Sequence, residues 1–307
     1  MKISELQKKI QAEITKAKKT EQNAEGLVRL QEAMQAYSGE DKLVWSDDLL
    51  EEIKKRPVTK GYEMGMDKLD TLIGGFRPQQ LVTISGHSKH GKTGWAMFSM
   101  EKLEETNPVM IPLEQSNEEL IMQRHENGQS IPRFLSPRKL ASRVTLDWIE
   151  ERIIEGIAKH NTKLVVIDHL GYIDNDSQHK ENLAYRIEMT MKGLKNLAKK
   201  WNVAILVLVH ISQHDESHPP TLQDLKGSSS ILQESDLVIM LWRKNRLENK
   251  VRLYDDKTMV SVLANRRTGK TGSVGLRFES STGRYHVEHE WVENLINEAE
   301  RNDIDDF

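Results

Sequence analysis

From residue 81 onward, the chain alternates short apolar runs with amphipathic stretches. The runs are LVTIS (81–85), VMIPLE (109–114), KLVVID (163–168), VAILVLVH (203–210) and LVIMLWR (237–243). Uninterrupted apolar runs of this length are typical of parallel strands that are buried on both faces. Between the runs, apolar residues recur at helical spacing, for example at Leu146, Ile149, Ile153 and Ile157. The pattern predicts an α/β fold with a mostly parallel central sheet flanked by helices.

The two ends of the chain differ from this central part. The segments TMVSVLANR, GSVGLRFE and RYHVE follow residue 243 and are separated by turn residues, which predicts antiparallel strands added to one edge of the sheet. Residues 1–56 carry 11 basic and 11 acidic side chains and predict a small helical extension, whose last helix, 49–55, has Ser46 as its cap. We therefore expect three parts: the extension 1–56, a main α/β domain 57–286 and an acidic tail 287–307.

Composition restricts the class of protein further. Hydrophobic residues make up 37% of the chain and charged residues 30%, with a net charge of −3, so contacts with nucleic acid must be local. The chain has no cysteine, which excludes disulfides and thiolate chemistry. It has no long apolar run, and its amino terminus is charged throughout, unlike a signal peptide. We expect a cytoplasmic protein.

The stretch SGHSKHGKTG (85–94) matches the phosphate-loop pattern G-x-x-x-x-G-K-T. It follows a predicted strand and opens a predicted helix, about 92–104, which is the context this motif requires. Glycines let backbone N–H groups curl around phosphate oxygens, Lys92 supplies a positive charge, and the Thr93 hydroxyl is suited to bind Mg²⁺. The predicted site binds ATP or another NTP through Gly86, His87, Ser88, Lys89, His90, Gly91, Lys92, Thr93 and Gly94.

Two other features of the sequence could be mistaken for binding sites. A second GKT, 269–271, lacks the first glycine of the pattern and lies between predicted strands, so it predicts a hairpin turn. His87 and His90 could suggest a metal site, but no third ligand stands at metal-binding spacing. We interpret them as variable residues of the loop.

Three polar residues close neighbouring predicted strands. Asp168 ends KLVVID, Glu114 ends VMIPLE and His210 ends VAILVLVH. Because the carboxyl ends of parallel strands meet at one edge of a sheet, we expect these side chains beside the phosphate loop. There Asp168 would support Mg²⁺ together with Thr93, Glu114 would polarise the attacking water, and His210 could contact the γ-phosphate.

These motifs, in this order, resemble the RecA-like P-loop motor domain of DnaB-type replicative helicases, most closely the helicase half of phage primase-helicases and of mitochondrial Twinkle. The resemblance covers roughly residues 57–285, and rests on GYEMGMDKLDTLIGGFRPQQLVTISG, PLEQSNEEL, VVIDHLGYI, LVLVHISQ, DLKGSSSILQESDLVIMLWR and LANRRTGKTG. It implies an NTPase that couples hydrolysis to 5′ to 3′ translocation on single-stranded DNA and to duplex unwinding. It also implies that Glu114 is the catalytic base and that His210 senses the γ-phosphate.

The same resemblance implies a homo-hexameric ring. Arg266 matches the arginine finger, which in the family reaches the nucleotide of a neighbouring subunit; a guanidinium supplied in this way makes hydrolysis depend on assembly. Many members carry a lysine two residues before the finger, where this chain has Ala264. Activation between subunits is therefore expected to be weaker or differently built.

DNA contacts are expected in loops after the aspartate and sensor strands, about 172–181 and 212–230. Lys226, with Gly227 and Ser228, matches a position that contacts the DNA backbone. The second loop is otherwise poor in basic residues, so its affinity for DNA is expected to be modest or shared with another region. The tail 287–307 carries eight acids and one arginine and ends in Phe307, which suits docking on a primase, polymerase or single-strand-binding protein; a solvated terminus is the alternative.

Two other functions fit part of the pattern. One is a recombinase-like or clock-like RecA ATPase that forms filaments or rings without unwinding. The other is a non-catalytic helicase relative that serves as a scaffold or loading partner. The segments PLEQS and DLKGSSS disfavour the first, and the complete set of Lys92, Thr93, Glu114, Asp168 and Arg266 disfavours the second.

Overall fold

The structure is a computed structural model, and it describes residues 8, 12, 43–55, 60–174, 183–211, 216–221, 224, 229–288 and 290–292. The chain forms two compact units, Met1–Thr59 and Lys60–Phe307. In the first unit, helix α3 (Ser46–Lys55) begins at Ser46 itself, three residues earlier than expected. No helix in the described ranges has the length and apolarity needed to cross a membrane.

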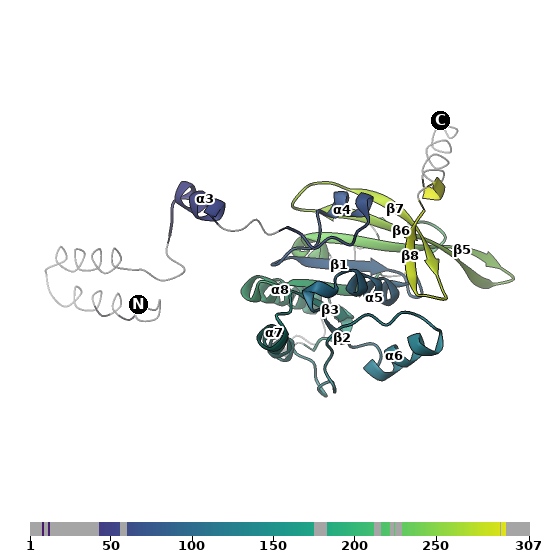
Figure 1. Cartoon of the computed structure of the whole chain (residues 1–307), viewed down its shortest axis with the longest axis horizontal. Helices are drawn as coiled ribbons and strands as arrows, with labels where there is room; N and C mark the ends of the chain where they lie inside the picture. Colours follow the sequence, from purple (N-terminus) through teal and green to yellow (C-terminus); the bar gives the residue numbers. More distant parts are fainter. Residues whose placement is uncertain are drawn as a thin grey trace. The chain divides into compact units, whose positions relative to one another are not determined.

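The second unit is built on a sheet of eight strands in the order β2-β3-β4-β1-β5-β6-β7-β8 (Figure 1). The first five in that order pair in parallel and the rest pair antiparallel. The sequence prediction of a parallel sheet with an antiparallel edge is therefore confirmed. The strands are β1 (Leu81–Gly86), β2 (Val109–Pro112), β3 (Leu164–Asp168), β4 (Ala204–His210), β5 (Leu237–Glu248), β6 (Val251–Asn265), β7 (Gly272–Glu279) and β8 (Arg284–Val287).

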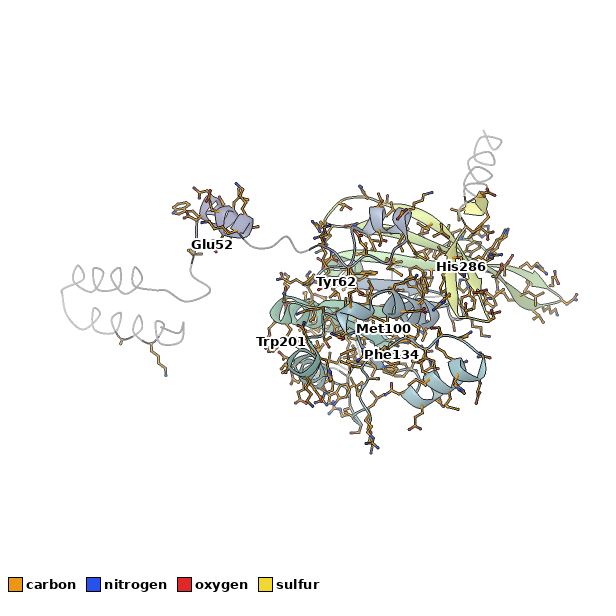
Figure 2. All side chains as sticks on the ribbon, viewed as in Figure 1. Glu52, Tyr62, Met100, Phe134, Trp201 and His286 are labelled. Atoms are coloured by element: carbon orange, nitrogen blue, oxygen red, sulfur yellow. The ribbon has the colours of Figure 1, made fainter. Side chains whose placement is uncertain are left out.

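Helices cover both faces of the sheet, as the apolar patterns require. One buried cluster joins α4 (Asp67–Ile73) and α5 (Lys92–Lys102) to the sheet, and the other joins α7 (Leu146–His160) and α8 (Leu183–Trp201) to its opposite face. Figure 2 shows Met100 of α5 among interior side chains, whereas His286 of β8 is exposed. The remaining helical elements are α6 (Asn117–Glu126), α9 (Ser229–Glu234) and the short η1 (Glu104–Thr106) and η2 (Leu170–Tyr172).

Two strands differ from their predicted bounds. β2 ends at Pro112 rather than at residue 114, because the N–H groups of Leu113 and Glu114 both donate to the carbonyl oxygen of Asp168 instead of continuing a ladder. β5 and β6 extend beyond the predicted strands into a long hairpin, visible at one end of the sheet in Figure 1. Its turn residues, Asn249 and Lys250, both have positive φ, which suits a tight two-residue hairpin turn.

Candidate nucleotide-binding site

The phosphate loop lies between β1 and α5, at the carboxyl edge of the parallel strands, as predicted. Its two defining glycines are required by the backbone. Gly86 has φ 154° and a Cβ there would lie 2.6 Å from the carbonyl oxygen of Leu241, while Gly91 has φ 87° and a Cβ there would lie 2.8 Å from Tyr285 Oη. The loop then opens the eleven-residue helix α5, whose N–H groups and positive dipole end favour an anion.

Lys92 is buried at the start of α5. Its Nζ donates to the carbonyl oxygens of Gly86 at 2.9 Å and His87 at 2.8 Å, so the ammonium closes the loop on itself. Burial lowers the pKa of Lys92 to about 8, although the carboxylates of Asp168 and Glu114 act in the opposite direction. The ammonium is therefore held where phosphate oxygens could replace the two carbonyl acceptors.

Thr93 and Asp168 meet beside the lysine. The hydroxyl of Thr93 donates to Asp168 Oδ2 at 2.6 Å. Asp168 is only 2% exposed, and its Oδ1 has no hydrogen-bond partner among the described residues. Burial raises the pKa of Asp168 to about 6, an effect that the hydrogen bond from Thr93 reduces. A buried carboxylate oxygen left without a partner, next to a hydroxyl, is a donor set that suits a hard divalent cation such as Mg²⁺.

Glu114 and His210 also reach this edge. Glu114 Oε2 lies 3.6 Å from His210 Nε2, and the carboxyl group of Glu114 is exposed. Burial lowers the pKa of His210 in spite of the nearby carboxylate. The geometry thus brings Lys92, Thr93, Asp168, Glu114 and His210 together, as the sequence predicted.

His169 is a member of this group that the sequence reasoning missed. Its ring lies 4.4 Å from that of His210 between centroids, and the ligand atoms of Glu114, His169 and His210 lie within 4.8 Å of one another. Its Nδ1 accepts a 2.8 Å hydrogen bond from the N–H of Gly171, and burial lowers its pKa to about 4. Neutral His169 therefore carries its proton on Nε2, so it offers a donor to the site rather than a lone pair to a metal. The only signal in the sequence was a histidine directly after Asp168.

One of the two phosphate-loop histidines, His90, makes contacts that the sequence analysis did not foresee. His90 is fully buried, and its Nδ1 accepts a 3.0 Å hydrogen bond from the backbone N–H of Arg243 in β5. Its ring packs edge-on against Tyr254 of β6, with centroids 5.5 Å apart. His90 is thus a packing residue that ties the loop to the hairpin.

A hollow of about 620 Å³ is lined in part by Arg243 and Tyr254, the two hairpin residues that contact His90, although none of the described residues of the phosphate loop lines it. The guanidinium of Arg243 lies 5.7 Å from the ring centroid of Tyr254 and 5.9 Å from that of Phe278, which places a planar cation among aromatic faces. The lining consists of Arg243, Tyr254, Asp256, Arg277, Phe278, Glu279, Ser280, Ser281 and His286. The sequence analysis did not identify this hollow, because its residues come from four strands, β5, β6, β7 and β8, and from the turn after β7, with no shared motif.

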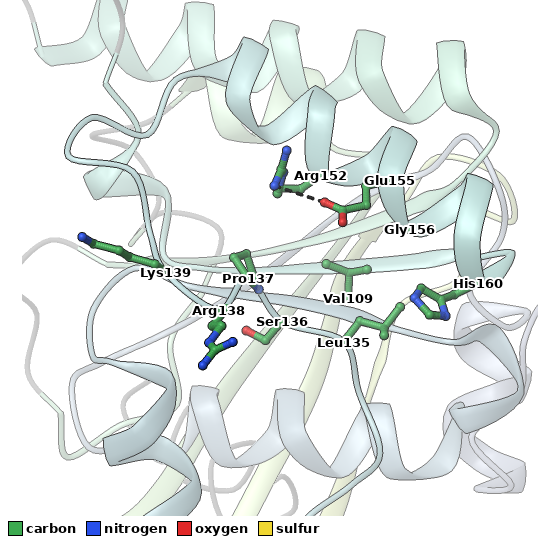
Figure 3. A pocket seen from close by; sticks show the side chains of 10 residues that line it. All are labelled: Val109, Leu135, Ser136, Pro137, Arg138, Lys139, Arg152, Glu155, Gly156 and His160. Carbon is green, nitrogen blue, oxygen red and sulfur yellow. Dashed lines mark ion pairs between the residues drawn. The ribbon is translucent and has the colours of Figure 1, made fainter.

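Another hollow, of about 410 Å³, lies at the outer edge of β2 and against α7 (Figure 3). Val109 and Leu135 form its apolar floor, and Arg152 forms an ion pair of 3.1 Å with Glu155 on its wall. None of the described residues of the phosphate loop lines it. It is separate from the nucleotide site.

Arg266 and the phosphate loop lie at opposite ends of the sheet's strands: the loop follows the carboxyl end of β1, and Arg266 lies near the level of its amino end. Asn265 pairs with Leu237 at the start of β5, and Leu237 pairs with Val82 near the start of β1, whereas the loop begins at the end of β1. Four residues of strand separate these two levels, about 13 Å, so the exposed Arg266 is not directed at its own phosphate loop. The side chain of Asn265 shapes the turn by accepting hydrogen bonds from the N–H groups of Arg267 and Thr268.

The rest of this turn agrees with its sequence interpretation. Residues 269–271 lie in the connection between β6 and β7, so the second GKT is a hairpin turn and not a phosphate loop. Ala264, where a lysine was expected from the resemblance, packs against Val238 and Met240. The predicted DNA contacts Lys226, Gly227 and Ser228 lie outside the described residues, as do most of the loop 172–181 and of the tail 287–307.

Comparisons with known proteins agree with this geometry. The family described as DnaB-like helicase C terminal domain matches residues 139–287. A probable replicative DNA helicase of Trieres chinensis is 26% identical over 75% of this chain and 58% of its own length. The replicative DNA helicase DnaB of Mycoplasma pneumoniae is 28% identical over 78% of this chain and 60% of its own length. The chain thus spans less than two thirds of these relatives.

Solved structures show the same fold. One that is described as an ATPase domain superposes with a TM-score of 0.64 at 19% identity, covering 80% of this chain and 99% of that one. A DnaB-like replicative helicase, described together with its interactions with primase, superposes with a TM-score of 0.63 at 17% identity over 91% of this chain and 75% of that one. Residues 139–287 therefore match the DnaB-like helicase C terminal domain, and the sheet on which they lie has the fold of a RecA-like ATPase domain.

Proposed function

We propose that this chain is the motor of a ring-forming DNA helicase, which hydrolyses ATP or another NTP and uses the energy to move along single-stranded DNA and separate a duplex. One observation carries the proposal above the others. Groups that bind phosphate and activate water meet at one edge of the sheet, while Arg266 stands at the opposite edge. One chain holds both halves of a composite site, in an arrangement that suits contact between neighbouring copies.

The phosphate loop and Lys92 would bind the phosphates of the nucleotide. When nucleotide enters, the Lys92 ammonium exchanges the carbonyl oxygens of Gly86 and His87 for phosphate oxygens. Thr93 and Asp168 would hold Mg²⁺, the first directly and the second as its carboxylate support, and the bound ion would neutralise charge on the phosphates. The partnerless Oδ1 of Asp168 supports this assignment.

Water activation falls to Glu114. Its exposed carboxylate can accept a proton from a water placed between it and the γ-phosphate. His210, 3.6 Å from that carboxylate, is placed to register whether the γ-phosphate is present. His169, whose free ring proton is on Nε2, would donate to the water or to a phosphate oxygen and so orient it.

We assign the base of the nucleotide to the hollow lined by Arg243 and Phe278, which is linked to the phosphate loop by the hydrogen bond from the Arg243 N–H to His90. A planar base could stack on the Arg243 guanidinium or on the Phe278 ring, although not between them, because they are only 5.9 Å apart, and such a contact would accept any base because each has a flat π face. This supports use of several NTPs rather than ATP alone.

Assembly and DNA binding complete the proposal. Arg266 would reach the nucleotide of the next subunit, which supports a homo-hexameric ring with hydrolysis dependent on assembly. Lys226, Gly227 and Ser228 would contact the backbone of single-stranded DNA.

The acidic tail would dock on a primase, polymerase or single-strand-binding protein; one structural neighbour is itself described with primase. We further propose that the chain is most similar to the helicase half of phage primase-helicases and of Twinkle. Its translocation on single-stranded DNA would run from 5′ to 3′.

The test is steady-state NTP hydrolysis over a range of protein concentrations, with and without an unstructured thymidine oligonucleotide. We expect the rate per subunit to rise with protein concentration, because Arg266 acts between subunits, and to rise again with DNA. A rate that is independent of both concentration and DNA would contradict a ring motor and would favour a RecA-like ATPase with another task.

A further inference from the structure

The phosphate loop contains a buried histidine that phosphate binding does not require. The His90 side chain is fully buried, and its Nδ1 accepts a hydrogen bond from the N–H of Arg243. Burial lowers the pKa of His90 to about 4, so the ring is neutral near pH 7. With Nδ1 occupied as an acceptor, the proton of the neutral ring is on Nε2.

This Nε2–H points at Glu216. His90 Nε2 lies 3.6 Å from Glu216 Oε2, too far for a hydrogen bond, and it has no other hydrogen-bond partner in the part of the chain that the structure describes. A buried donor without an acceptor is unfavourable, and a small movement of either residue would satisfy it. The gap is therefore a contact that a shift of the phosphate loop can close.

Glu216 is held firmly at the other end of this contact. Its carboxylate accepts a 3.0 Å hydrogen bond from Tyr254 Oη and lies 3.4 Å from Arg252 Nε. Its backbone carbonyl accepts from Trp242 Nε1 at 2.9 Å and from Asn245 Nδ2 at 2.7 Å. Movement of Glu216 would therefore change contacts with both strands of the β5–β6 hairpin.

Glu216 lies in the sequence between the strand that ends at the nucleotide site and the proposed DNA contacts. It follows β4, which ends at His210 beside Glu114, and precedes the proposed DNA contacts at 226–228. On nucleotide binding, Lys92 would exchange the carbonyl oxygens of Gly86 and His87 for phosphate oxygens, which would release two contacts that hold the loop in its present conformation. His90 belongs to this phosphate loop and is the residue of it that faces Glu216.

We propose that His90 and Glu216 form a coupling link, in which nucleotide binding brings His90 Nε2–H onto the Glu216 carboxylate and so transmits the state of the phosphate loop to the segment that leads to the DNA contacts. His90 and Glu216 are positioning residues in this link. The link deepens the proposed function and rests on it for its role in the response to DNA.

The test compares three variants with the wild-type chain. His90→Asn keeps an acceptor near the position of Nδ1 and removes Nε2–H. Glu216→Gln keeps the size of the side chain and removes its charge. Glu248→Gln is the matched control, because Glu248 lies on the same hairpin, is exposed and pairs with Arg246 at 2.6 Å.

The first readout is the ratio of the hydrolysis rate with a thymidine oligonucleotide to the rate without it. We expect this ratio to fall by at least about threefold in His90→Asn and in Glu216→Gln, with no further fall in the double variant, and to stay unchanged in Glu248→Gln. Glu216→Gln is expected to keep the rate without DNA. A wild-type ratio in Glu216→Gln, or losses that multiply in the double variant, would overturn the link.

The second readout does not depend on hydrolysis or DNA. We expect MgATP binding to change hydrogen exchange at residues 216–221 in the wild-type chain and not in His90→Asn. If the wild-type chain showed this change but no stimulation by DNA, the proposed motor function would fail and the link would stand. If nucleotide bound without changing exchange at 216–221, the link would fail whatever the rate with DNA.

Discussion

The hydroxyl of Thr93 at the start of α5 donates a 2.6 Å hydrogen bond to Oδ2 of Asp168 at the end of β3, and so joins the phosphate loop to a neighbouring strand. The contact leaves the other carboxylate oxygen of Asp168 buried without a partner in the described structure. Two residues 75 positions apart thereby become one site.

Replacing Asp168 with Asn tests this pair. The amide has the same shape but no charge, so we expect Mg²⁺-dependent hydrolysis to fall by roughly 100-fold while the chain stays folded. Steady-state hydrolysis over a Mg²⁺ titration measures it, with Asp67→Asn on the exposed face of α4 as the control. Hydrolysis at the wild-type rate at every Mg²⁺ concentration would exclude Asp168 from metal support.

Glu114 is expected to serve the chemical step and not binding. In Glu114→Gln the amide cannot take a proton from water, so hydrolysis should fall by at least about 100-fold, while nucleotide affinity stays close to that of the wild type. Equilibrium binding and single-turnover hydrolysis separate the two effects. Glu118→Gln, exposed in the first turn of α6, should behave as the wild type. A weakened affinity with an unchanged turnover rate would reverse the assignment.

Arg266 is expected to act on the neighbouring subunit. Lys92→Ala should lose nucleotide binding, and Arg266→Ala should lose hydrolysis while keeping binding. Mixed assemblies of these two inactive variants contain some interfaces with an intact Lys92 on one side and an intact Arg266 on the other, so mixing should restore part of the activity. If the mixture were as inactive as its components, Arg266 would not work between subunits.

The Gly171–His169 contact predicts a role for a small residue outside the motifs. A Cβ on Gly171 would lie 2.7 Å from Cε1 of His169, so Gly171→Ala is expected to displace this ring, which packs 4.4 Å from that of His210. We expect slower hydrolysis, by about tenfold, with little change in nucleotide affinity. Ser142→Ala, a change of similar size at an exposed position, is the control and should behave as the wild type. An unchanged turnover rate in Gly171→Ala would mean that His169 does not orient reacting groups.

Buried His90 predicts a dependence of stability on pH. Its pKa is lowered from 6.5 to about 4 in the folded chain. Below pH 6.5 the unfolded chain binds this proton and the folded chain does not, so the free energy of unfolding should decrease as pH falls from about 6.5 to about 4, by at most about 1.4 kcal/mol per pH unit from this group. Urea unfolding of the wild type and of His90→Asn at several pH values measures the difference. Parallel curves for the two proteins would show that His90 is not the responsible group.

The sequence by itself determined the parallel sheet, its antiparallel edge and the phosphate loop. Apolar runs such as 203–210 can only be satisfied by burial on both faces, and the spacing of Gly86, Gly91, Lys92 and Thr93 is a local requirement for wrapping backbone N–H groups around phosphate. It also placed Asp168 and His210 at one edge, because parallel strands end together. Local pattern was sufficient wherever the chemistry follows from a strand end.

Tertiary structure alone decided the rest. The burial of His90 depends on β5 and on Glu216, which lie far away along the chain, and no spacing rule connects them. The hollow among Arg243, Tyr254 and Phe278 likewise joins residues from different strands, and the proton position on His169 depends on the backbone conformation that directs the Gly171 N–H at Nδ1. The location of Arg266 opposite the phosphate loop follows from the order and register of the strands. Periodicity records which side of an element is buried, but only the folded sheet decides which buried groups face one another.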